Sequence, residues 1–173
     1  MKALFLSAAI ALMGLSFTAH ATTTEELLAQ ARKAYSEREY GAAGIQRAQD
    51  AADLYGQLVA QATDAKSKAK YLVGQAEALY FVGNANASSS VKIEKHLKGM
   101  EAADQAAKLL GVVDVTKVSD ADVEKLKTSL SAEDLLLLAQ ALYQRGTNLG
   151  QWGAANGVTS SLGKWPELRS TMN

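Results

Sequence analysis

Apolar side chains recur at spacings of three and four residues along most of the chain, and proline, the strongest helix breaker, occurs only once, at Pro166. This spacing places the apolar residues on one face of an α-helix. Alanine, the best helix former, supplies 32 of the 173 residues. Together these features predict an all-α fold of about six to seven helices.

The periodic segments and the residues between them predict where the helices lie. Their apolar positions span residues 27–35, 45–62, 69–80, 93–110, 123–130 and 135–152. Capping residues mark helix starts at Thr23, Ser119 and Ser131, and the pair Thr63-Asp64 precedes the restart of the apolar pattern. Breaks are predicted at 39–41, at the small polar loop 83–90, and at Gly111. Residues 112–118 are the only β-like stretch, and we expect an extended connector there because no second strand exists to pair with it. Pro166 predicts the start of a short last helix.

The N-terminus has the pattern of a secretory signal peptide. Lys2 gives a positive start, residues 3–17 are almost entirely apolar, and small residues stand at Ala19 and Ala21. This arrangement predicts cleavage after Ala21 and export to a bacterial periplasm. The apolar run is shorter than the roughly 20 residues that span a bilayer, which disfavours an uncleaved anchor. We therefore expect residues 1–21 to be removed and residues 22–173 to form a single all-α domain that carries no lipid anchor, because the chain has no cysteine.

Charge and residue content disfavour several functional classes. The 18 basic residues balance 18 acidic ones, whereas a nucleic-acid binder needs a basic surplus. The absence of cysteine excludes disulfides and thiolate sites. His96 is the only histidine after residue 21, and its place at the edge of an apolar stripe predicts a surface or boundary position. A zinc site needs three or four ligands, so we expect no metal. No assembled catalytic motif is present either, and we expect no cofactor and no enzymatic activity.

One eight-residue pattern occurs twice. Residues 76–83 and 139–146 both read A-x-A-L-Y-x-x-G. Small residues let two helices approach closely, and the tyrosines, Tyr80 and Tyr143, are suited to fill the groove between helical hairpins. The offset of the two copies is close to two tetratricopeptide periods of 34 residues, though not equal to them. The pattern predicts a tetratricopeptide-like stack of helical hairpins, with chance similarity in an alanine-rich chain as the alternative.

Polar and aromatic residues gather at the ends of both copies. Aromatic rings beside amide and guanidinium donors are typical of a small-molecule pocket. The alternative is that the aromatic residues pack between repeats while the polar groups cap helix ends. The predicted ligand- or partner-binding residues are Tyr80, Asn84, Tyr143, Arg145, Asn148 and Trp152, and Phe81, Thr147, Gln151 and Asn156 lie among them in the sequence.

Residues 142–157 resemble a segment of the T-component proteins of tripartite ATP-independent periplasmic (TRAP) transporters, in which an L-G-x-W core is followed by x-x-x-G. Residues 98–110 resemble the K-G-M-x-x-A helix of that family, and residues 71–80 the helix before it. The resemblance implies an all-α, tetratricopeptide-like fold, a homotrimer with a central pore, and docking of the transporter's periplasmic substrate-binding protein for ligand transfer. Two departures are the missing lipid-anchor cysteine and the end of this chain at Asn173, where family members tend to continue.

The sequence therefore predicts a non-enzymatic periplasmic protein that holds a protein partner or a small organic ligand. One alternative is a structural protein that acts only by oligomerising. A second is a hydrolase that uses a serine with Lys70, Lys164 or His96, on the basis of two S-x-x-K matches at 67–70 and 161–164 that lack their companion motifs.

Overall fold

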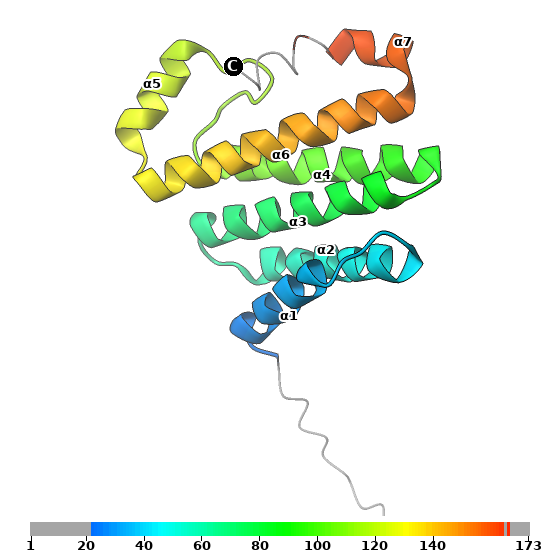
Figure 1. The fold of residues 1–173 in the computed structure, drawn as a ribbon. Helices are drawn as coiled ribbons and strands as arrows, with labels where there is room; N and C mark the ends of the chain where they lie inside the picture. The colour runs from blue at the N-terminus through cyan, green and yellow to red at the C-terminus, as the bar shows by residue number, and fades with distance from the viewer. Residues whose placement is uncertain (1–21, 165, 167–173) are drawn as a thin grey trace, which may run out of the picture.

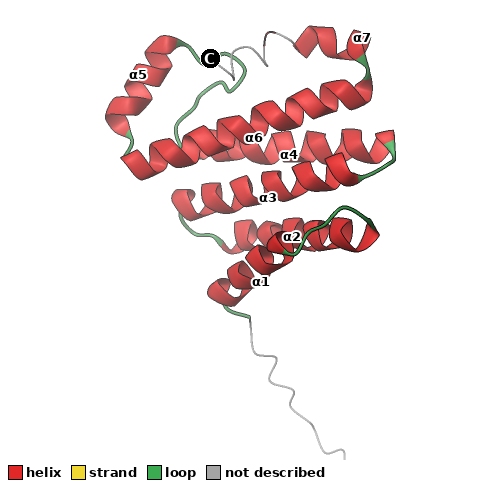
Figure 2. Cartoon of the chain, in the orientation of Figure 1, coloured by secondary structure: helices red, strands yellow, loops and turns green. Residues whose placement is uncertain are grey.

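The computed structural model describes residues 22–164 and 166, and every regular element in that part is a helix, with no strand. The predicted signal peptide and the end of the predicted last helix, residues 167–173, lie outside the described residues. Figures 1 and 2 show the order of the elements along the chain. They are α1 (Thr24–Ser36), α2 (Ala42–Gln61), α3 (Ala65–Ala85), α4 (Ser89–Leu109), α5 (Asp120–Ser129), α6 (Ala132–Asn156), the short α7 (Val158–Ser161) and a 3-10 turn (Leu162–Lys164).

All four predicted helix starts are confirmed by capping hydrogen bonds. The hydroxyls of Thr23, Ser119 and Ser131 accept from the backbone N–H three residues later, and Asp64 does the same with its carboxylate. Thr23 and Ser119 complete reciprocal capping boxes with Glu26 and Asp122. These local contacts satisfy backbone donors that a helix leaves unpaired in its first turn.

The glycines play two different roles. Gly111 follows α4 with φ of +100°, the conformation that ends a helix and that side chains disfavour, as predicted. Gly83 and Gly146, in contrast, lie inside α3 and α6 and do not end them. The loop after α3 is accordingly shorter than predicted, because α3 continues to Ala85 and α4 begins at Ser89.

The helices stack as antiparallel hairpins in two layers, which confirms the predicted architecture. α3 packs against α2, α4 and α6, and α4 packs against both α3 and α6. In Figure 1 the chain rises from α1 to α6, with α2 and α4 behind α1, α3 and α6. Residues 112–118 connect α4 to α5 without forming a strand, as predicted, but they are not extended. They contain a turn in which Lys117 N donates to the backbone oxygen of Asp114 at 3.2 Å.

Small side chains allow the helices to pack closely. The largest cluster joins α3, α4 and α6 and is completed by Val112 and Val115 of the connector and Leu126 of α5. Its buried alanines, with side chains that are at most 4% exposed, permit close approach of the helix axes, as the sequence predicted. They are Ala69, Ala76, Ala102, Ala103, Ala106, Ala107 and Ala141. Among the described residues, no helix has both the length and the apolar character that crossing a membrane requires.

Candidate functional site

Two of the predicted binding residues lie in the interior, where Arg145 joins α6 to α4 and Asn148 joins α6 to α3. Arg145 is 1% exposed, and its Nε donates to Asp104 Oδ1 at 2.7 Å. Asn148 is completely buried, and its Nδ2 donates to the backbone oxygens of Gln144 at 2.9 Å and Ala76 at 3.4 Å. Both side chains therefore hold the helices together and are not presented at the surface of a groove.

His96 is the third buried polar residue, and the prediction of a surface or boundary position is wrong. Its side chain is 1% exposed, and its Nδ1 lies 3.2 Å from Asn148 Oδ1. Because that oxygen can only accept, Nδ1 is the protonated nitrogen of the neutral ring. Burial lowers the pKa of His96, against the raising effect of the Asn148 hydrogen bond, and nearby Lys92 lowers it further.

Two glycines create the space for this polar pair. A Cβ on Gly83 would lie 2.6 Å from His96 Nε2, and a Cβ on Gly99 would lie 2.5 Å from Asn148 Oδ1. Both distances are far inside van der Waals contact, so only glycine fits at either position. The sequence analysis placed Gly83 at a helix end and Gly99 inside a helix, and neither glycine indicated a polar pair packed against it.

The remaining predicted residues are spread over the molecule. Tyr80 is half-buried and meets the edge of the His96 ring, with centroids 5.8 Å apart. Asn84 is half-buried near the end of α3, and Trp152 is half-buried in α6. Tyr143, in contrast, is 67% exposed. The structure thus brings His96, Tyr80 and Asn148 together inside the stack and separates Tyr143 from them.

Tyr143 lines a groove of about 390 Å³ between α3 and α6. We call this the α3/α6 groove. Its lining consists of Val73 and Glu77 from α3 with Ala139, Gln140, Tyr143 and Gln144 from α6. Leu136 lies two helical turns before Tyr143 and is also highly exposed, at 61%. One side of α6 therefore presents two large exposed side chains, Leu136 and Tyr143, and Tyr143 borders the groove.

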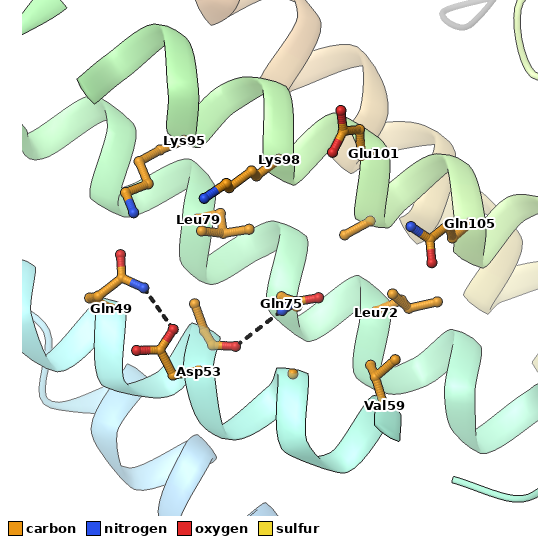
Figure 3. Close-up of a pocket in the computed structure, with 13 residues that line it drawn as sticks. Gln49, Asp53, Val59, Leu72, Gln75, Leu79, Lys95, Lys98, Glu101 and Gln105 are labelled. Carbon is orange, nitrogen blue, oxygen red and sulfur yellow. Dashed lines mark hydrogen bonds between the residues drawn. The ribbon is translucent and has the colours of Figure 1, made fainter. Parts of the chain in front are cut away.

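A second groove, of about 400 Å³, lies between α2 and α4 with α3 as its floor (Figure 3). We call this the α2/α4 groove. Gln49 and Asp53 line it from α2, and Lys95 and Lys98 line it from α4. The floor is formed by side chains of α3 at helical spacing, Leu72, Gln75 and Leu79. Sequence reasoning missed this groove because its polar residues cannot be distinguished, in the sequence, from those on an ordinary solvent-exposed helix face.

Neither groove contains the constellation that metal binding requires. Within residues 22–164 and 166, no three His, Asp or Glu side chains converge to hold a metal ion. What the grooves offer is shape, exposed aromatic and apolar surface, and charges on opposite walls, which are the means of binding small molecules and protein partners.

Comparisons of this chain with protein-family models, with curated proteins and with solved structures return no match.

Proposed function

We propose that the protein is a periplasmic scaffold of tetratricopeptide-like form that docks a transporter's substrate-binding protein and passes a small organic ligand, without catalysing a reaction. The observation that carries this proposal is the exposed surface of α6 beside the α3/α6 groove. Tyr143 and Leu136 are 67% and 61% exposed there. The resemblance of residues 142–157 to TRAP-transporter T-components supplies the class of partner.

The chemistry of this surface suits protein docking. Tyrosine gives a large contact area at low entropic cost, and tyrosines are enriched among the residues that dominate binding energy at interfaces. Exposed apolar patches with polar borders are typical of interaction sites. Glu77, Gln140 and Gln144 supply such a border around Tyr143.

The buried polar residues support this surface from behind. Arg145 and Asn148 lie on the same helix as Tyr143 and anchor it to α4 through Asp104 and His96. Rigid support of this kind lowers the entropic cost of binding, because the helix that carries Tyr143 is already in place.

Titration of a TRAP-transporter substrate-binding protein into residues 22–173 tests the proposal. We expect a complex whose affinity falls about tenfold or more in Tyr143→Ala, in line with the loss of an interface anchor. Tyr40→Ala is the matched control, because Tyr40 is 81% exposed but does not line the α3/α6 groove. Its complex should keep the wild-type affinity.

Two results contradict the proposal. One is the absence of any complex with that protein. The other is a trimer, detected by light scattering, that dissociates in Tyr143→Ala, since it assigns the exposed face of α6 to self-association and supports the purely structural alternative.

A further inference from the structure

The α2/α4 groove holds opposite charges on its two walls. Asp53 lies on the α2 wall, where its Oδ1 accepts from Gln49 Nε2 at 2.9 Å. Lys95 and Lys98 lie on the α4 wall, and Glu101 adds a carboxylate further along the same wall. Figure 3 shows the ends of both lysine side chains over the groove, on the side that faces Gln49 and Asp53.

These charges face one another without pairing. Within the described chain, neither lysine lies within the 4.0 Å of Asp53 that an ion pair requires. They interact at longer range, since the pKa of Lys98 is raised first by Glu94 and to a smaller extent by Glu101 and Asp53. The groove therefore separates a carboxylate from two ammonium groups by more than contact distance.

The lysines keep hydrogen-bond donors for a ligand. Lys98 Nζ lies 2.9 Å from Glu94 Oε1, and Lys95 Nζ lies 3.6 Å from the same oxygen. An ammonium group has three N–H donors, so one carboxylate oxygen does not exhaust either side chain. The Lys95 side chain is only 19% exposed, so its charge lies in a partly desolvated position where electrostatic attraction is less screened.

Beside the charged end, the groove becomes apolar. Leu79 lies beneath the lysines, and Leu72 and Val59 continue the apolar surface away from them (Figure 3). Gly56 adds no side chain to the α2 wall there, and a Cβ at that position would approach Gln75 Nε2 to 3.0 Å.

We propose that the α2/α4 groove binds the zwitterion of an apolar α-amino acid. The carboxylate of the ligand pairs with Lys95 and Lys98, its ammonium pairs with Asp53, and its side chain covers Leu79 and Leu72. The groove volume of about 400 Å³ is ample for such a molecule. The inference rests on the proposed function in one respect, which is that the protein carries a small ligand without transforming it.

Calorimetric titration with three probes tests the charge pattern. The probes are L-leucine, N-acetyl-L-leucine, which lacks the ammonium, and L-leucinamide, which lacks the carboxylate. For residues 22–173 we expect saturable binding of leucine that is about tenfold tighter than that of either derivative, a factor that corresponds to about 1.4 kcal/mol.

Two variants test which side chain binds the ammonium and which binds the carboxylate of the ligand. Asp53→Asn should lower the affinity for leucine to that for N-acetyl-leucine and leave N-acetyl-leucine binding unchanged. Lys98→Gln should weaken leucine and N-acetyl-leucine alike while sparing leucinamide. Asp50→Asn is the matched control, because Asp50 accepts from Gln46 with the same spacing that joins Asp53 to Gln49 but does not line the groove.

The inference is overturned if leucine does not saturate the protein at millimolar concentration, if the three probes bind equally, or if Asp50→Asn weakens leucine binding as much as Asp53→Asn. Any of these results leaves docking of the substrate-binding protein at Tyr143 untouched. Conversely, loss of that docking with intact leucine selectivity contradicts the proposed function and spares this site.

Discussion

The side chains of His96 and Asn148 occupy a space that two glycines leave open between α3, α4 and α6. The arrangement satisfies buried polar groups that are costly to leave unpaired. It also explains why Gly83, the last residue of the repeated eight-residue pattern, lies within a helix and does not end it. The sequence identified the important position but not its role, since that role depends on a ring from another helix.

Gly83→Ala should destabilise the protein by about 1–3 kcal/mol, because the new Cβ would lie 2.6 Å from Nε2 of the buried His96 ring. Urea denaturation of residues 22–173 measures this. Gly150→Ala is the control: Gly150 is exposed in α6 with nothing within 4 Å of a Cβ, so this change should stabilise by up to about 1 kcal/mol through helix propensity. Equal effects of the two substitutions would refute the packing described for His96.

The buried histidine also predicts a pH dependence of stability. The pKa of His96 is lowered from 6.5 in the folded protein, so below that pH the unfolded chain binds a proton that the folded protein does not. The free energy of unfolding should therefore fall as pH drops from about 7.5 to about 5.5. The carboxyl groups of Asp64, Asp122 and Asp134, whose pKa values are lowered from 3.8, titrate below this range.

His96→Gln should remove this decrease, because residues 22–173 contain no other histidine. Urea unfolding at both pH values measures it in the wild type and the variant. A decrease of the same size in both proteins would show that His96 is not the titrating group.

At the scale of single elements, local contacts made the helix starts predictable. A capping hydroxyl and the N–H that it satisfies lie three residues apart, so the sequence contains both partners. Ser119 and Ser131 were identified in this way, and Gly111 was identified as a helix end. The contacts between elements were not predictable, because the partners Arg145 and Asp104 are 41 residues apart.

Ser131→Ala should cost about 1 kcal/mol of stability, since the hydroxyl accepts from Asp134 N at the start of the longest helix. Ser88→Ala provides the comparison. Ser88 occupies the same position before α4, but its hydroxyl makes no capping bond and contacts Ser90 Oγ instead. Thermal or urea unfolding that ranks Ser88→Ala as the more damaging change would contradict the capping described for α6.

Removing the partner of a buried guanidinium is more damaging than removing a cap. Asp104→Ala should cost about 3 kcal/mol or more, because Arg145 remains buried at 1% exposure with a charge that has lost this carboxylate. Glu101→Ala, on the exposed side of the same helix, should change the free energy of unfolding by about 0.5 kcal/mol at most. A near-neutral Asp104→Ala would mean that the pair does not anchor α6 to α4.

At the scale of the whole molecule, the stack of alanine-lined hairpins was predictable, because small residues at helical spacing form a helix face against which a second helix packs closely. The binding surfaces were not. The α3/α6 and α2/α4 grooves each combine residues from helices that are distant in the sequence, and their polar residues are indistinguishable from solvated helix faces until the packing is known. Of the residues predicted from sequence, Tyr143 lines a groove, whereas Arg145 and Asn148 support its helix from within.

The central claim is that the outer face of α6 docks a protein partner. Hydroxyl-radical footprinting tests it within a single molecule, because both Tyr143 and Tyr40 are exposed enough to react in the free protein, at 67% and 81%. With saturating substrate-binding protein, the oxidation of Tyr143 and Leu136 should fall severalfold while that of Tyr40 stays unchanged. Unaltered oxidation of Tyr143 in the formed complex would contradict the account.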